Sequence, residues 1–190
     1  IMMSNTALLA QHPPTFGLKG GLNLSNWSTE GEGETEMKTG GHLGLLSHIH
    51  LSPEWALQPE LQFSTQGAET TIQGTEFTWK MNYINVPVMV QYMFNNGFRI
   101  EAGPYAGFLI NGKLESENGA EDEVTNEFKK TDFGLGFGIN YLSYSGFGVG
   151  GRYNLGLTNI NDARVNETRN RVLQLSVFYM FDKNHKAKSR

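Results

Sequence analysis

Three histidines, His42, His48 and His50, lie in one segment and would share one face of a β-strand. Imidazoles two residues apart on a strand can chelate a metal ion, and a histidine beside Asp132 or Ser64 can serve a hydrolytic reaction. No recognisable catalytic motif surrounds them, and no partner that would orient such an imidazole can be assigned. The pattern therefore favours histidines that bond to other interior polar groups, and it predicts no catalytic residue, metal site or cofactor.

The acidic run from Glu30 to Glu36, which reads E-G-E-G-E-T-E, is a second candidate site. Its carboxylates can attract Ca²⁺, but the run lacks the Asp and Asn ligand spacing of a dedicated calcium loop. It therefore predicts a solvated loop. The Gly20-Gly21 pair is not a phosphate-binding loop, because no helix is predicted after it.

The histidine segment is one of eight stretches in which apolar and polar residues alternate, the pattern of a half-buried β-strand. These stretches are 15–26, 40–51, 55–65, 77–94, 98–110, 131–141, 147–160 and 171–181. Their apolar faces carry no Asp, Glu, Lys or Arg, and their opposite faces are rich in glycine. Pro59, Pro87 and Pro104 lie inside three of the stretches and weaken the strand prediction locally, because proline lacks a ladder donor.

The links between the stretches alternate in length. Three are short, and the other four, at 27–39, 66–76, 111–130 and 161–170, are long and polar. Fourteen of the 19 acidic residues lie in the long links: Glu30, Glu32, Glu34, Glu36, Glu69, Glu76, Glu115, Glu117, Glu121, Asp122, Glu123, Glu127, Asp162 and Glu167. In an up-and-down meander alternate links emerge at opposite ends, so one end has short turns and the other has long acidic loops. This is the pattern of outer-membrane barrels.

The fold class predicted is therefore all-β: an eight-stranded antiparallel up-and-down transmembrane β-barrel with short periplasmic turns and long acidic extracellular loops. The chain has 190 residues and no run of about 18 apolar residues, which excludes a transmembrane helix. A barrel strand needs only about 9–11 alternating residues to span a bilayer. A face without charges suits lipid, because Arg or Lys at mid-bilayer costs roughly 2–4 kcal/mol.

The polar faces would then line a narrow interior that side chains can fill. Buried charges must be paired, so we predict a plugging network of polar groups in the lumen. Its expected members are Lys19, His48, Glu60, Arg99, Glu101, Asp132 and Arg152. A gated polar path through the same residues is the alternative.

Aromatic residues gather near both ends of the stretches, as in the interfacial girdles of membrane barrels. The residues expected at the membrane interface are Trp27, Trp55, Trp79, Tyr92, Phe98, Tyr141, Phe147, Tyr179 and Phe181. Residues 1–14 are interpreted as a leader remnant or mobile arm, 15–181 as the barrel, and 182–190 as a basic tail. The net charge of −4 argues against a nucleic-acid partner.

Five segments resemble the PorT-like outer-membrane β-barrel family of the Bacteroidota, over about residues 15–181. They are F-G-L-K-G-G-L-N-L-S, L-Q-P-E-L-Q-F-S-T-Q-G, Y-I-N-V-P-V-M-V-Q-Y, F-R-I-E-A-G-P-Y-A-G-F-L and D-F-G-L-G-F-G-I-N-Y. The resemblance implies an eight-stranded barrel of the OmpX class in the bacterial outer membrane. The stretch ending at Phe181 also resembles the closing strand of such barrels, whose terminal aromatic is part of the signal read by the assembly machinery.

The function expected is a structural or protein-interaction role with a plugged lumen. The partners expected are outer-membrane lipid and lipopolysaccharide, the barrel assembly machinery during insertion, and an envelope protein. Two alternatives stay open: a soluble lipocalin-like barrel that binds a small apolar ligand with its apolar face inward, and an outer-membrane barrel enzyme that uses the histidines.

Overall fold

The computed structural model describes residues 13–29, 33–72, 74–117, 119–160 and 167–181 of the chain. Ten strands are formed in these ranges: β1 (Thr15–Thr29), β2 (Gly33–Glu34), β3 (Lys38–His50), β4 (Trp55–Ile72), β5 (Thr75–Met93), β6 (Phe98–Ser116), β7 (Glu121–Glu123), β8 (Thr131–Leu142), β9 (Phe147–Gly156) and β10 (Thr168–Met180). Helical structure in the described ranges is limited to the turn η1 (Thr125–Glu127), and no helix there is long and apolar enough to cross a membrane. The predicted tail 182–190 and most of the predicted leader lie outside these ranges, as does part of the acidic run that begins at Glu30.

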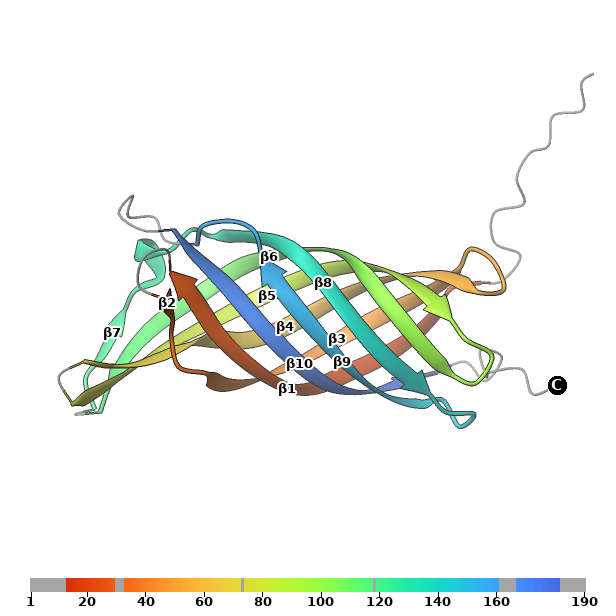
Figure 1. Cartoon of the computed structure of the whole chain (residues 1–190), viewed down its shortest axis with the longest axis horizontal. Helices are drawn as coiled ribbons and strands as arrows, with labels where there is room; N and C mark the ends of the chain where they lie inside the picture. The colour runs from red at the N-terminus through yellow and green to blue at the C-terminus, as the bar shows by residue number, and fades with distance from the viewer. Residues whose placement is uncertain (1–12, 30–32, 73, 118, 161–166, 182–190) are drawn as a thin grey trace, which may run out of the picture.

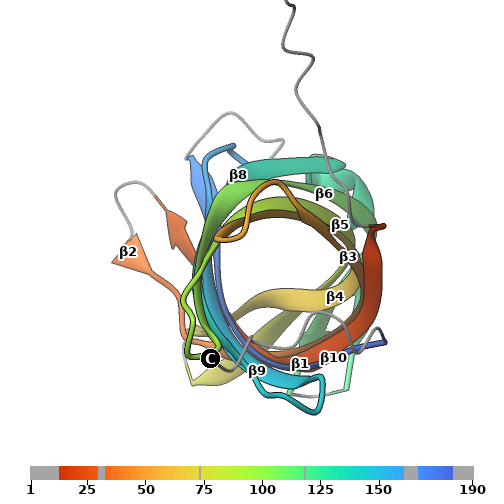
Figure 2. The same cartoon turned by 90° about the vertical axis from the view of Figure 1, so that its right-hand side faces the viewer.

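Eight long strands close into a ring (Figures 1 and 2). The order is β10-β9-β8-β6-β5-β4-β3-β1, and β1 pairs antiparallel with β10 to close it. That closing ladder runs from the pair Gly17 and Met180 to the pair Thr29 and Thr168. Closure leaves the ring without an unpaired sheet edge. β2 and β7 are short additions that pair with β1 and β6.

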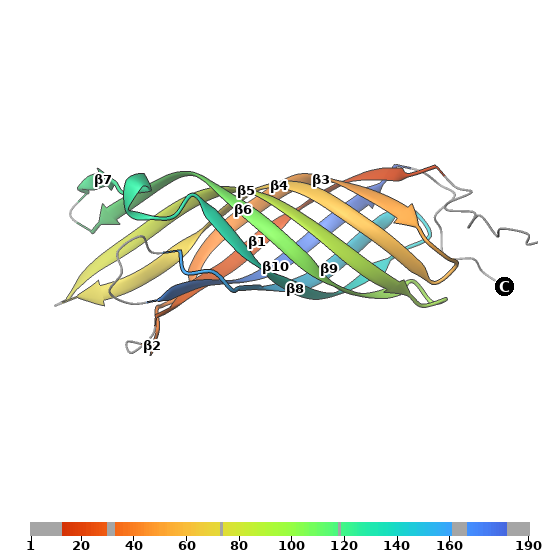
Figure 3. The same ribbon diagram turned by 90° about the horizontal axis from the view of Figure 1, so that it is seen from above.

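Six of the eight long strands extend beyond their predicted bounds at the end of the ring where the long links lie, called the long-link end, and β4 and β6 extend furthest. The expected loop 66–76 is instead mostly strand, because β4 runs to Ile72 and β5 begins at Thr75. β6 likewise continues to Ser116 and pairs with β7. The result is a sheet of β4, β5, β6 and β7 that projects past the ring on one side (Figure 3).

The three internal prolines lie in strands, and the ladders are interrupted near them. The β4–β5 pairing stops at Pro59 and Val88 and resumes at Gln62 and Asn85. The β5–β6 pairing stops at Pro87 and Tyr105 and resumes three residues nearer the short turns, at Val90 and Ala102. The gaps arise because proline has no N–H to donate to a ladder. β4, β5 and β6 nevertheless continue as strands on both sides of the prolines.

Apolar side chains point outward from the ring and polar side chains point inward. The exposed fraction is 65% for Leu43, 64% for Ile139 and 63% for Val177. The lumen, defined as the interior of the ring, holds buried polar residues such as Asn23 and Gln174. This arrangement overturns the lipocalin-like alternative, in which the apolar face would point inward to hold a ligand.

Two apolar clusters also lie inside the ring. At the long-link end, buried residues from strands and loops pack together: Trp27, Ala68, Met81, Tyr83, Leu109, Val124 and Ile160. Toward the short turns, Leu46, Leu142, Phe178 and Met180 form a second cluster. The polar network of the lumen lies between these two clusters.

Candidate functional site

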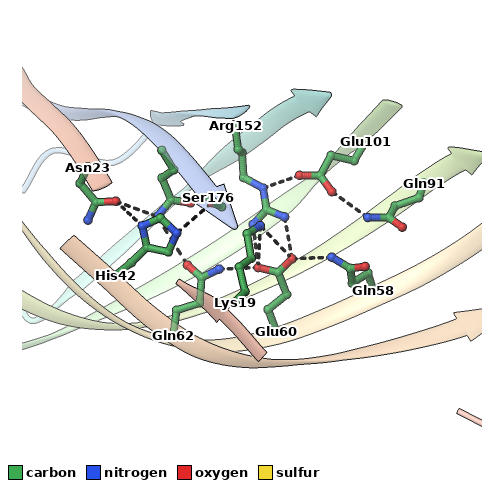
Figure 4. Close-up of polar contacts among 11 residues, drawn as sticks. Lys19, Asn23, His42, Gln58, Glu60, Gln62, Gln91, Glu101, Arg152 and Ser176 are labelled. Carbon is green, nitrogen blue, oxygen red and sulfur yellow. Dashed lines mark hydrogen bonds and ion pairs between the residues drawn. The ribbon is translucent and has the colours of Figure 1, made fainter. Parts of the chain in front are cut away.

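An ion pair between opposite walls crosses the middle of the lumen (Figure 4). Arg152 on β9 donates from Nη2 and Nη1 to the two carboxylate oxygens of Glu60 on β4, at 2.6 and 2.9 Å. Its Nε donates to Oε1 of Glu101 on β6, at 2.6 Å. Arg152 is only 2% exposed, so both pairs are shielded from bulk water. A planar guanidinium suits this arrangement because it can hold two carboxylates with directed bonds.

Neighbouring side chains complete the bonding of the two carboxylates. Lys19 Nζ lies 3.4 Å from Glu60 Oε1, and Gln58 Nε2 donates to the same oxygen at 2.7 Å. Gln62 donates to the other oxygen of Glu60. Gln91 Nε2 donates to Glu101 Oε2 at 2.8 Å. Such full bonding is what buried charges require to offset the loss of hydration.

His42 belongs to a layer of neutral polar residues next to this ion cluster. Its Nδ1 lies 2.7 Å from Asn23 Oδ1, and its Nε2 lies 2.9 Å from Ser176 Oγ. The amide of Asn23 also donates to Ser64 Oγ at 2.9 Å. Both ring nitrogens of His42 thus form hydrogen bonds with side chains in the lumen. This bonding fits a structural role for the imidazole.

Asp132 anchors a separate group nearer the long-link end. Its Oδ2 accepts a hydrogen bond from Tyr105 Oη at 3.1 Å, and its Oδ1 accepts one from Thr158 Oγ1 at 2.9 Å. Asp132 is buried and belongs to β8, whereas Thr158 lies just after β9. Asp132 does not join the Arg152 cluster.

The structure thus buries all seven residues expected in the polar network but joins only Lys19, Glu60, Glu101 and Arg152 into one cluster. The ring of His48 instead packs edge-on against His50, with centroids 4.8 Å apart. Arg99 is buried but forms no ion pair within 4 Å among the described residues. In the described part of the chain no group of three His, Cys, Asp or Glu side chains is arranged to hold a metal ion.

The expected network does not include the uncharged partners of the carboxylates, although the alternation of the strands indicates that these residues point inward. Asn23, Gln58 and Gln62 occupy the same alternating faces as the charged residues. A prediction based on charged residues alone omits them. Neutral amides are needed in a crowded interior because each carboxylate oxygen accepts more than one hydrogen bond.

The aromatic residues expected at the membrane interface divide into two sets. Seven lie near the short turns on the outer surface: Trp55, Tyr92, Phe98, Tyr141, Phe147, Tyr179 and Phe181. Several of their rings are in contact, with centroids 5.2 Å apart for Trp55 and Tyr92 and 4.7 Å apart for Phe147 and Tyr179. These residues form a band around the outside of that end.

The expectation that Trp27 and Trp79 lie at the outer surface is wrong. Trp27 is 6% exposed and belongs to the inner apolar cluster. Trp79 packs against that cluster, with its ring centroid 5.6 Å from that of Trp27. The cause is the alternation of the strands, because Trp27 is in phase with the inward residues Lys19 and Asn23. The two indoles thus pack together in the apolar cluster at the long-link end, where Trp79 is partly buried.

Comparison with solved structures agrees with this architecture. The structure of Neisserial surface protein A superposes with a TM-score of 0.59 at 14% identity, covering 90% of this chain and 100% of that chain. Ail, the attachment invasion locus protein of Yersinia pestis, superposes with a TM-score of 0.54 at 13% identity over the same shares of the two chains. At these identities the likeness shows the fold alone.

No relative is found among curated protein sequences. The family model described as "Outer membrane protein beta-barrel domain" matches residues 9–162, most of the chain. The outward apolar wall, the closed ring and the polar lumen all fit that family. The chain therefore belongs to the outer membrane protein beta-barrel domain family and is a β-barrel of the bacterial outer membrane.

Proposed function

We propose that the protein has a structural or protein-interaction role in the outer membrane, with a lumen closed by side chains. The observation that carries the proposal is the bridge from Arg152 to Glu60 and Glu101, which links opposite walls at the middle of the barrel. An eight-stranded barrel has an interior that side chains can fill. This bridge and the two apolar clusters fill the interior, which argues against the transport of a solute through it.

We also infer that the protein is not an enzyme. His42, the best-placed candidate base, has both ring nitrogens bonded to Asn23 and Ser176. Asp132 and Ser64 bond to other side chains, and neither forms a hydrogen bond with His42. A base that activates a serine is also bonded to it, but His42, Ser176 and Asn23 are all buried among lumen side chains, so a substrate has no access to them.

The orientation follows the rule for barrels of this kind, with the short turns toward the periplasm and the long-link end outside. The outward apolar wall would contact outer-membrane lipid and lipopolysaccharide. The barrel assembly machinery would act during insertion and read the aromatic end of the last strand, near Phe181. Nucleic acid is not an expected partner, because phosphate binding requires a basic surface.

The surface proposed to bind an envelope protein is the projecting sheet of β4, β5, β6 and β7. Its segment 115–127 contains no Lys or Arg and carries Glu115, Glu117, Glu121, Asp122, Glu123 and Glu127. Ail was solved in complex with the heparin analogue sucrose octasulfate, a polyanion. An acidic segment would repel a polyanion, so the partner proposed for this barrel is a protein with a basic surface.

We further propose that the chain belongs to the PorT-like group of the Bacteroidota within its wider family. The support is the set of sequence segments quoted above, including Y-I-N-V-P-V-M-V-Q-Y at 83–92 and D-F-G-L-G-F-G-I-N-Y at 132–141. The role of PorT itself in protein secretion is not transferred to this chain.

Photo-cross-linking in cells that produce the protein tests the interaction surface. A cross-linking amino acid at Glu117 should capture a protein partner, and the same residue at Asn96, in a short turn, should not. Combined E121Q, D122N and E123Q substitutions should abolish the adduct from position 117, because they remove three of the six negative charges of the segment. An equal adduct from position 96, an adduct that survives the three substitutions, or no adduct at all would contradict the proposal.

A further inference from the structure

The charges of the lumen do not balance around the central cluster. Lys19 and Arg152 share the carboxylates of Glu60 and Glu101, which accounts for two positive and two negative charges. Arg99 adds a third positive charge on the lumen face of β6, two residues before Glu101. The Glu101 carboxylate attracts it but is already bonded to Arg152 and Gln91. Arg99 therefore has no carboxylate of its own.

The Arg99 side chain is nevertheless enclosed. It is 6% exposed, and no carboxylate of the described residues lies within 4 Å of its guanidinium. An arginine keeps its charge at any physiological pH. A buried charge without a counterion is costly, so an arginine in such a place calls for an anion.

A second donor lies beside Arg99. Asn140 on β8 is its direct partner in the ladder, so the two side chains enter the lumen next to each other. Asn140 is also 6% exposed, and its Nδ2 donates to no acceptor among the described residues. Gly150 on β9 leaves room for this amide, because a Cβ there would lie 1.9 Å from Asn140 Oδ1.

The two residues lie at the short-turn end of the barrel. Arg99 is the second residue of β6, and Asn140 is the third from the end of β8. A planar guanidinium forms paired hydrogen bonds with oxyanions, and a neighbouring amide N–H adds a further donor. We propose that Arg99 and Asn140 bind a small inorganic oxyanion, which supplies the counterion that Arg99 lacks. This site is independent of the partner-binding role proposed above.

Phosphate titration of the full-length protein, folded in a non-ionic detergent, tests the site. Sodium phosphate replaces sodium chloride at fixed ionic strength while the NMR resonances of the Arg99 guanidinium and the Asn140 amide are followed. Saturable shifts at these two side chains are expected. R99Q and N140D should each weaken phosphate affinity at least tenfold, R99Q by removing the charge and N140D by adding an internal counterion. R169Q, which alters an exposed arginine, should leave the affinity unchanged.

N140D is the decisive variant, because it keeps Arg99 in place and exchanges the NH2 group of the side chain for a negatively charged oxygen of similar size. It should fold, as judged by a mobility shift on boiling in SDS gels, and it should resist unfolding better than the natural sequence. The proposal is wrong if N140D fails to fold, if it binds phosphate as tightly as the natural sequence, or if the natural sequence gives no saturable response. An equal shift of the Asn140 amide in R99Q would mean an adventitious ion only.

Discussion

Glu60 and Arg152 are 92 positions apart in the sequence and meet inside the barrel, with Nη2 to Oε1 at 2.6 Å and Nη1 to Oε2 at 2.9 Å. Their strands, β4 and β9, are four places apart in the ring in either direction. The pair therefore joins opposite walls, and it contributes to closing the lumen as well as to balancing charge. Substitution of one partner should therefore affect both the closure of the lumen and the stability of the barrel.

Glu60→Gln keeps the shape of the side chain and removes its charge. Arg152 and Lys19 then share the single carboxylate of Glu101, and the loss of a buried partner is expected to cost about 3–5 kcal/mol in unfolding free energy. Urea unfolding in lipid vesicles, followed by tryptophan fluorescence, measures this cost. Lys80→Gln is the matched control, because it breaks an exposed pair with Glu115 whose contribution should be about 0–1 kcal/mol. Equal effects of the two substitutions would contradict the account.

The two tryptophan environments predict opposite responses to lipid-borne quenchers. A variant that keeps only Trp55, with phenylalanine at the other two positions, should be strongly quenched by brominated lipids, since that side chain is 47% exposed on the outer wall. A variant that keeps only Trp27 should be barely quenched, because its indole is enclosed in the apolar cluster. Comparable quenching of the two would mean that Trp27 faces lipid.

Gly103 is required where two backbones approach closely. A Cβ at this position would lie 2.1 Å from the carbonyl oxygen of Val88, so Gly103→Ala must move the β5 backbone. Overpacking of this kind costs about 1–3 kcal/mol or more. Gly151→Ala is the control, because its nearest neighbour would be Leu175 Cδ2 at 3.8 Å. Urea midpoints of both variants test the difference, and a Gly103→Ala variant as stable as Gly151→Ala would refute the steric argument.

His42 is expected to matter for stability. His42→Ala leaves Ser176 Oγ without its imidazole partner and Asn23 Oδ1 with only the hydrogen bond from Gln174, and an unmet buried polar group costs about 1–3 kcal/mol. His42→Gln should recover part of that loss, because its amide can both donate and accept. Urea unfolding compares the two variants. No loss of stability in His42→Ala would remove the structural role assigned to this residue.

Alternation along the strands decides whether a side chain points into the lumen or outward, and this could be predicted from the sequence. The prediction that Trp27 lies at the membrane interface is wrong because it follows the tendency of aromatic residues to form girdles, whereas the alternation of side chains along β1 turns Trp27 inward. The long strands around Ile72 were missed because apolar alternation fades there, although β-branched residues such as Thr70 and Thr71 favour strand.

The membership of the ion cluster depends on the stagger of strands around the ring, which sequence does not reveal. The expected network includes His48 together with Glu60. In the structure Leu46 is the residue of β3 aligned with Glu60, and His48 lies nearer the short turns. A shift of two residues in one strand thus decides which side chains meet.

The claim that the lumen is closed is tested most directly by electrical recording. The full-length protein is inserted into a planar bilayer, with insertion verified by the mobility shift on boiling of the same preparation. The natural sequence should give no discrete conductance steps, whereas Arg152→Ala, which removes the bridge between opposite walls, should give brief openings. A steady open level in the natural sequence, unaltered by Arg152→Ala, would contradict the closed lumen and support the alternative of a polar path.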